Sequence, residues 1–416
     1  MKLHWQIAIA LALAVAVGAY AAPESDLIRI CGFLGGLFLN ALKMVVVPLI
    51  MSSIIHALMT IGDAEALSRM GVKAMVYYLV TSLLAVLTGL AMVNLVHPGI
   101  IDGQPAKELL GLATSGVKVS EQISGASLSD ITQVFYRMIP ANPIKAAADS
   151  DLLGLVFFSL IFGYFASRLP DALLKTQRDF WGSVRETMMG ITGLVMRFAP
   201  IGVFALVAKA FANTGIEAIK PLALFFVATL GGLAFHLFVT MSLVLWGVAR
   251  VSPWRMLQAM SPALLTAFST STSAGTLPVT LDCLRKRAGV SDRVTAFTLP
   301  LGAAINLDGS ALYECAVAMF LAQAYGLHLD LTTQFIIVWM AVVTSMGVTG
   351  IPSASLVAIA VILGTIGLPL EGIGVILAVD RVLDMCRTAV NVYGDACGAV
   401  VVARLEGETD ILRAPA

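Results

Sequence analysis

Eight long apolar segments constrain the fold of this sequence more than any other feature. They cover residues 5–22, 31–61, 72–96, 152–166, 191–211, 222–248, 297–324 and 372–402. A helix crosses the hydrocarbon core of a bilayer with about 17–25 residues. Several segments exceed that length, so we expect their helices to be tilted or bent. The pattern predicts an all-α membrane protein with eight transmembrane helices.

The composition argues against other classes of protein. Hydrophobic residues make up 58% of the 416 residues and charged residues 12%, whereas a soluble domain averages about 45–50% apolar and about 25% charged. The 26 basic and 26 acidic side chains cancel, so we expect no nucleic-acid partner. The five cysteines show no CxxC spacing, which favours isolated reduced thiols over a disulfide framework or a zinc site.

The first apolar segment ends in Ala-Tyr-Ala-Ala-Pro, which is typical of a cleavable signal peptide. It is also long enough to span a bilayer and further spans follow, so we interpret it as a retained first helix. Two polar stretches, 102–127 and 168–185, are interpreted as connections outside the membrane. The basic residues obey the positive-inside rule if both termini are cytoplasmic.

Two further segments, 256–284 and 333–368, are unlike ordinary spans. Each has two short apolar arms around a polar centre, 269–276 in the first and 347–355 in the second. Both centres mix hydroxyl residues and glycine, and proline lies within or just after them, which favours a turn. Non-helical backbone at membrane depth must be buried in protein or line a wet cavity. We therefore predict two re-entrant helical hairpins whose tips meet at a central polar site.

The last span carries the strongest chemical signal, a set of polar residues on one face. At about 100° per residue the set falls within an arc of about 100°, and it consists of Asp380, Asp384, Arg387, Thr388, Asn391 and Asp395. Each charge at bilayer depth costs roughly 2.5–3.5 kcal/mol, so this face should line a cavity or pair internally. The planar fork of Arg387 suits a carboxylate, while Asp384 suits an amino group.

The seventh span contains the sequence Asn306-Leu307-Asp308-Gly309-Ser310. Glycine and asparagine are weak helix formers, so we expect an unwound turn with free carbonyl groups. Together with Asn306, Asp308 and Asp395, these carbonyls would be hard oxygen ligands for a small cation.

These motifs, taken with Gly275-Thr276-Leu277-Pro278, Gly350-Ile351-Pro352 and Tyr77–Ser82, resemble the glutamate transporter family, the dicarboxylate/amino acid:cation symporters. The resemblance covers essentially the whole chain. It implies a homotrimer of elevator type, with a fixed scaffold domain and a moving transport domain. The implied divisions are scaffold helices at 1–72 and 150–220, transport-domain helices at 73–100 and 221–250, a loop at 101–149, a transport core at 251–406 and a tail at 407–416.

The resemblance also assigns site residues. Substrate would contact Ser271, Ser273, Ser310, Ile351, Asp384, Arg387, Thr388 and Asn391. Sodium, the co-transported ion, would contact Gly302, Asn306, Asn391, Asp395, Tyr78, Thr81, Ser82, Asp308, Ser345 and Met346. Glu314 would carry a proton, and Gly350, Pro352 and Ser355 would belong to the gate. No organic cofactor is implied.

The predicted function is sodium-coupled symport of glutamate or aspartate through a plasma membrane, in bacteria the inner membrane, with proton coupling left open by Glu314. The alternative is a proton-coupled symporter of acidic amino acids or C4-dicarboxylates. Leu307 replaces the family's usual methionine, and Ser271 and Met385 occupy the two positions where relatives carry a second arginine. An enzyme, an intramembrane aspartyl hydrolase using Asp308 and Asp395, would leave Arg387 and both hairpins without a role.

Overall fold

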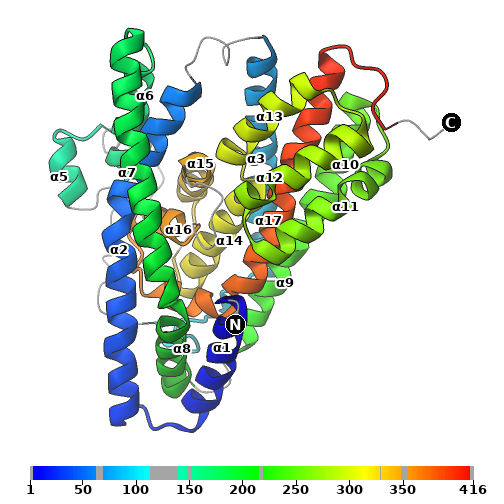
Figure 1. Ribbon diagram of the computed structural model, residues 1–416. Coiled ribbons are helices and arrows are strands. Elements are labelled where there is room, and N and C mark those ends of the chain that lie inside the picture. Colours follow the sequence, from blue (N-terminus) through cyan, green and yellow to red (C-terminus); the bar gives the residue numbers. More distant parts are fainter. Residues whose placement is uncertain are drawn as a thin grey trace.

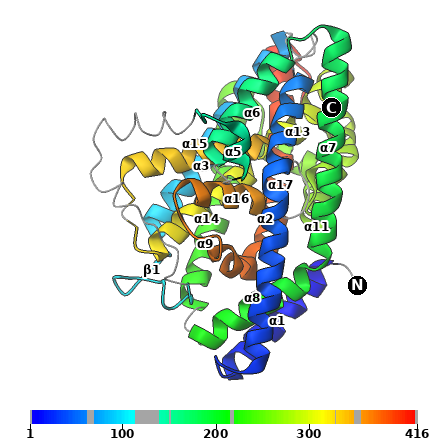
Figure 2. The same ribbon diagram turned by 90° about the vertical axis from the view of Figure 1, so that its left-hand side faces the viewer.

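The computed structural model describes residues 3–61, 69–112, 139–148, 152–214, 219–327, 329–347 and 355–412. Within these ranges the chain is almost entirely helical (Figures 1 and 2). The helices before the first hairpin are α1 (Leu3–Tyr20), α2 (Asp26–Ile61), α3 (Arg69–Val96), α5 (Pro143–Ala148), α6 (Leu152–Ala166), α7 (Asp171–Arg197), α8 (Ala199–Thr214), α9 (Ile219–Phe235) and α10 (Met241–Val244). Those after it begin with α13 (Asp292–Ile305) and α14 (Asp308–Ala324), and continue with α15 (Leu331–Gly347), α16 (Ser355–Thr365) and α17 (Gly372–Leu405).

Two continuous helices in the described ranges are long and apolar enough to cross a membrane, Met70–Val96 and Ile219–Ala249. The second of these includes the π-helical turns η2 (His236–Thr240) and η3 (Leu245–Ala249). A third span exists if α7 and α8, which are bent by 57° relative to each other, count as one. Of the other predicted spans, α6 has 15 residues, the 297–324 segment is divided into α13 and α14, and α17 carries four charged residues between positions 380 and 387. The count of eight therefore stays a prediction.

The polar connection predicted at 168–185 is largely helical, and its place outside the membrane stays a prediction. Helix α7 begins at Asp171 and runs without interruption to Arg197. Pro170 lies just before the helix, where its missing N–H removes no hydrogen bond, and Asp171 places a negative charge in the first turn. Polar side chains on the helix surface explain the composition of this stretch without any loop.

A small departure from an all-α fold follows α3. Strands β1 (Ile100–Ile101) and β2 (Gln104–Pro105) pair antiparallel across a two-residue turn. Asp102 and Gly103 both have positive φ, at 51° and 79°, as the favoured two-residue hairpin turns require.

The first predicted hairpin is confirmed as helix–turn–helix. Helix α11 (Pro253–Thr270) packs against α12 (Ser273–Cys283), which continues into the π-helical turn η4 (Leu284–Ala288). Ser271 breaks the helix with φ of 51°, and the Thr272 side chain then accepts a hydrogen bond from the Gly275 N–H at 3.2 Å. The arms α15 and α16 of the second hairpin pack together, while its tip at 348–354 lies outside the described residues.

Helices α14 and α17 lie at the centre of the fold. Every residue of α14 is buried, and α17 packs against α3, α9, α11, α13 and α14. In Figure 1, α2, α6 and α7 stand on the opposite side of the molecule from α10 and α11. The polar face of α17 therefore points into protein.

Candidate functional site

The first part of the site is a group of paired charges that we call the arginine cluster: Tyr313, Asp380, Arg381, Asp384 and Arg387. Arg387 is 1% exposed. Its Nη2 lies 2.8 Å from Asp384 Oδ1, and its Nη1 lies 3.1 Å from Asp380 Oδ1. The two carboxylates come from successive turns of α17, so one guanidinium reaches both. This arrangement pairs the charges that the sequence placed on one helix face.

Two members of the arginine cluster were not predicted from the sequence. Arg381 Nη1 lies 3.1 Å from Asp384 Oδ2. The Tyr313 hydroxyl donates to Asp380 Oδ1 at 2.7 Å, and the Arg387 guanidinium lies 4.4 Å from the Tyr313 ring centroid. Two carboxylates and two guanidinium groups leave the cluster with no formal net charge.

Asn391 connects this cluster to the break between α13 and α14. Its side-chain oxygen accepts from the backbone N–H groups of Gly309 at 2.7 Å and Ser310 at 3.3 Å. Its amide nitrogen donates to Ser310 Oγ at 3.1 Å. Thr388 Oγ1 donates to the Asp384 carbonyl at 2.7 Å. The predicted polar residues 384, 387, 388 and 391 are therefore all buried, on the part of α17 that faces the start of α14.

The second part of the site, the carboxylate cluster, consists of Thr81, Ser82, His236, Asn306, Asp308 and Asp395. The α13–α14 helix is interrupted at Asn306 and Leu307, which confirms the predicted unwound turn. Asn306 Nδ2 donates to Asp395 Oδ1 at 3.0 Å. Asp308 Oδ1 accepts from Ser82 Oγ at 2.8 Å and from Thr81 Oγ1 at 3.4 Å.

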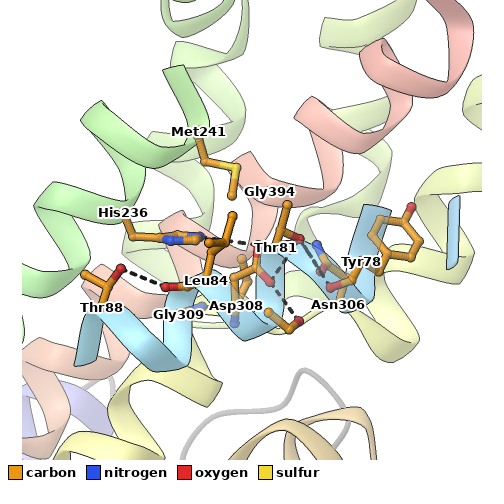
Figure 3. Close-up of polar contacts among 12 residues, drawn as sticks. Tyr78, Thr81, Leu84, Thr88, His236, Met241, Asn306, Asp308, Gly309 and Gly394 are labelled. Atoms are coloured by element: carbon orange, nitrogen blue, oxygen red, sulfur yellow. Dashed lines mark hydrogen bonds and ion pairs between the residues drawn. The ribbon is translucent and has the colours of Figure 1, made fainter. Parts of the chain in front are cut away.

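His236, at the start of the π-helical turn η2, faces the other oxygen of Asp308. Its Nε2 lies 3.5 Å from Asp308 Oδ2, and both side chains are fully buried (Figure 3). No hydrogen bond reaches Asp308 Oδ2 from the described part of the chain. Within those residues, neither Asp308 nor Asp395 pairs with a lysine or an arginine. The cluster therefore holds two buried carboxyl groups without a lysine or arginine partner among the described residues.

Close backbone contact shapes the carboxylate cluster. A Cβ atom added at Gly302 would lie 2.6 Å from Asp395 Oδ1 and 2.9 Å from the Tyr78 hydroxyl oxygen. The Tyr78 hydroxyl donates to the Thr298 carbonyl at 2.8 Å. The predicted ligands Tyr78, Gly302 and Asp395 are thus brought together, and the absence of a side chain at 302 lets them approach.

Glu314 is fully buried on α14, directly after Tyr313 of the arginine cluster. Thr344 Oγ1 donates to its Oε2 at 3.0 Å, and Ser355 also hydrogen-bonds its carboxyl group. Glu314 is therefore tied to both arms of the second hairpin. On the first of these arms, the predicted sodium ligand Ser345 donates its hydroxyl to the Val342 carbonyl of its own helix at 2.9 Å.

The hairpin tips are described in part. Ser271 and Ser273 are buried, and no hydrogen-bond partner for either hydroxyl is found in the described ranges. Gly350, Ile351 and Pro352 lie outside those ranges, as does the Met346 side chain, so their predicted roles stay predictions.

The donor set fits a hard cation better than a transition metal. The described residues hold no group of three or more His, Cys, Asp or Glu side chains that could bind a metal ion. What surrounds Asp308 and Asp395 is hydroxyl, amide and backbone oxygen, the ligand type of hard cations.

His236, Arg381 and Tyr313 are the polar residues that the sequence analysis missed. His236 is an ionisable residue inside an apolar segment, which is itself a signal of function. Arg381 falls at about 100° on the helical wheel, beyond the edge of the polar arc, but its long side chain reaches back. Tyr313 gave no signal that separates it from a core tyrosine.

Comparison with known proteins places this geometry among transporters. The family model described as the sodium:dicarboxylate symporter family matches residues 3–405. The chain is 33% identical to the proton/glutamate-aspartate symporter of Escherichia coli, over 98% of this chain and 94% of that protein. It is 32% identical to the proton/sodium-glutamate symport protein of Bacillus caldotenax, over 98% and 95%. It is 33% identical to human excitatory amino acid transporter 2, over 91% and 74%.

Proposed function

Because this chain belongs to the sodium:dicarboxylate symporter family, we propose that it carries glutamate or aspartate across a membrane together with sodium ions. The observation that supports this most is the buried Arg387–Asp384 pair, together with two buried carboxyl groups, Asp308 and Asp395, that have no lysine or arginine partner among the described residues. The first group suits an amino acid with an extra acid group, and the second suits a cation. The names of the relatives agree with such a substrate.

In this proposal the substrate opens the arginine cluster. Arg387 turns its planar fork from Asp384 and Asp380 to the side-chain carboxylate of the substrate, forming the bidentate pair that guanidinium groups favour. Asp384 then accepts hydrogen bonds from the amino group. Ser310, Thr388 and Asn391 supply the remaining polar contacts.

The hairpin tips would receive the α-carboxylate. The Ser271 and Ser273 hydroxyls are buried with unused hydrogen-bonding capacity, and α12 begins at Ser273, so the positive end of its helix dipole lies beside them and favours an anion. Backbone near Ile351 would close the other side. Gly350, Pro352 and Ser355 would then act as the gate over the bound substrate.

The carboxylate cluster is proposed as the sodium-binding region. Asp395, Asn306 and the Gly302 carbonyl would bind one ion, with Asn391 as a shared ligand. Asp308, Thr81, Ser82 and Tyr78 would bind another. A further site would use carbonyls near Ser345 and Met346, beneath the second hairpin.

The assembly and motion are also part of the proposal. The chain would form a homotrimer of scaffold domains, from which each transport domain moves across the bilayer. Both termini would face the cytoplasm, and eight helices would span the membrane. The separation of α2, α6 and α7 from α10 and α11 supports a division into two domains (Figure 1).

Proton coupling is the second candidate, and Glu314 favours it. A fully buried carboxyl group between the arms of the second hairpin could carry a proton in place of a sodium ion. The relatives include one named for protons alone and others named for both ions. The alternative substrate would be a C4-dicarboxylate.

Uptake of radiolabelled aspartate into liposomes containing the purified protein tests these proposals. We expect uptake driven by an inward sodium gradient at equal pH on both sides. Uptake that needs only a proton gradient and no sodium would contradict sodium coupling. Glu314→Gln would then separate the two: a sodium symporter keeps its sodium-driven uptake, whereas a proton symporter loses uptake.

A further inference from the structure

Asp384 is held from two sides, and one of its two partners has no role in the account above. Arg387 bonds its Oδ1, through Nη2 at 2.8 Å and Nε at 3.0 Å. Arg381 bonds its Oδ2 at 3.1 Å. Both carboxylate oxygens of a buried aspartate therefore depend on guanidinium groups from its own helix.

Substrate binding separates these two contacts. The fork of Arg387 cannot serve an incoming carboxylate while it remains bidentate to Asp384. Once it leaves, Arg381 is the basic group that remains at Asp384 in the described structure. The Arg381 side chain is 14% exposed, so it lies at the edge of the buried region and can stay there while Arg387 moves.

Charge counting gives Arg381 a second effect. Asp380 and Asp384 balance Arg381 and Arg387, so the empty arginine cluster is neutral. An acidic amino acid brings one net negative charge. Without Arg381 the cluster would carry one negative charge before binding and two afterwards, in a place with little water to screen them.

Arg381 also has hydrogen-bonding capacity left over. Its Nε is buried, and no acceptor for it is found in the part of the chain that the structure describes. A guanidinium group has five donors in a planar fork. It can therefore keep Asp384 in position and still turn a donor toward a bound carboxylate.

We propose that Arg381 is a positioning residue for substrate: it holds Asp384 toward the amino group and balances its charge when Arg387 transfers to the substrate. The inference rests on the proposed function, because it assumes that an acidic amino acid binds here. It adds a residue outside the polar arc of α17 to the determinants of acidic-substrate affinity.

The test is the dissociation constant of L-aspartate on purified protein in saturating sodium, for Arg381→Gln and Arg381→Lys. We expect about a tenfold weaker affinity with glutamine and at most about a threefold loss with lysine, which keeps the charge. Sodium binding measured without aspartate should be unchanged in both, which a general loss of folding would not allow. Arg285→Gln is the matched control, since it removes an arginine–carboxylate pair of 2.8 Å at Asp292, away from both clusters.

An affinity within twofold of the unsubstituted protein in Arg381→Gln would overturn the inference. Equal losses in the glutamine and lysine variants would overturn its charge-balancing part. If the unsubstituted protein does not bind aspartate at all, the proposed function fails and this inference fails with it. The two failures are therefore distinguishable in one experiment.

Discussion

The arginine cluster and the carboxylate cluster both depend on α17, yet their charges are satisfied in opposite ways. In the arginine cluster, two guanidinium groups and the Tyr313 hydroxyl serve Asp380 and Asp384. In the carboxylate cluster, Asp308 and Asp395 have hydroxyl and amide donors and one histidine, and among the described residues no lysine or arginine.

The difference shows what each region needs from a ligand. A cluster that is already neutral binds a ligand by exchanging partners, so its ligand must offer both a carboxylate and an amino group. A buried cluster whose carboxyl groups have no lysine or arginine partner among the described residues suits a ligand that supplies positive charge. In the proposed function, the placement of arginine along a single helix would therefore separate the substrate from the cation.

Of the substitutions that test this difference between the two clusters, loss of Arg387 should have the largest effect on ligand affinity. In Arg387→Cys we expect aspartate affinity to fall by more than about 100-fold, because removing one partner of a buried ion pair costs roughly 3–5 kcal/mol. Competition by neutral amino acids should rise. Equilibrium binding of labelled aspartate measures both. Arg404→Cys, which removes an arginine bonded to carbonyls at the far end of α17, is the control, and equal losses in both variants would contradict the role of Arg387.

Neutralising Asp395 should affect the ion and not the substrate class. In Asp395→Asn we expect the sodium concentration for half-maximal aspartate binding to rise by about tenfold or more, because charged ligands contribute more than neutral ones. A sodium titration at fixed aspartate measures this. Asp292→Asn, in an exposed ion pair, should leave the titration unchanged; an unaltered titration in Asp395→Asn would remove that carboxylate from the ion site.

A methyl group at position 302 should disturb the same region by crowding. In Gly302→Ala the new Cβ would lie 2.6 Å from Asp395 Oδ1, so the carboxylate must shift. We expect the sodium concentration for half-maximal aspartate binding to rise by about tenfold. Gly190→Ala places its Cβ in open space and should bind sodium normally. Similar titrations for the two variants would contradict the proposed contact between Gly302 and the ion ligands.

Replacing His236 tests how the orientation of Asp308 is maintained. In His236→Leu we expect about a fivefold rise in half-saturating sodium, because the leucine offers no polar contact to Asp308 Oδ2. His236→Gln keeps a donor at that place and should lose less. The sodium titration of aspartate binding distinguishes them, and equal losses would mean that His236 acts by packing alone.

The smallest effect is expected for a hydroxyl on α3. Ser82→Ala removes a 2.8 Å hydrogen bond to Asp308, and we expect about a threefold loss of sodium affinity, within the range of a single hydrogen bond. Thr88→Ala on the same helix removes a hydroxyl that bonds the Leu84 carbonyl (Figure 3). No difference between these two variants would count against Ser82 as an ion ligand.

Features set by local chemistry could be predicted from the sequence. The break at Asn306–Leu307, the turn at Ser271–Thr272 and the polar face of α17 all follow from residue type and helical spacing. These three features could be predicted without knowing which other parts of the chain pack against them. At 171–185 the same reasoning identified a polar stretch but not the helix that the structure has there.

Features that depend on a distant partner could not be predicted in this way. His236 meets Asp308 only because α9 and η2 pack against α3 and α17. Arg381 lies beyond the polar arc on the helical wheel, but the wheel locates the Cα atom and not the end of a long side chain. The roles assigned to residues 350–352 depend on a hairpin tip outside the described residues.

Asn391 has a consequence for how the two ligands affect each other. Its amide oxygen holds the first N–H groups of α14, directly after Asp308, while its own helix turn lies next to Arg387. In thermodynamic terms, any strengthening of substrate binding by sodium must be matched by an equal strengthening of sodium binding by substrate. In the proposed function, Asn391 would contact both the substrate region and the ion region, and this shared contact would couple the two binding events. Such coupling would disfavour a protein loaded with sodium alone or with substrate alone, so neither ligand would leak across the membrane without the other.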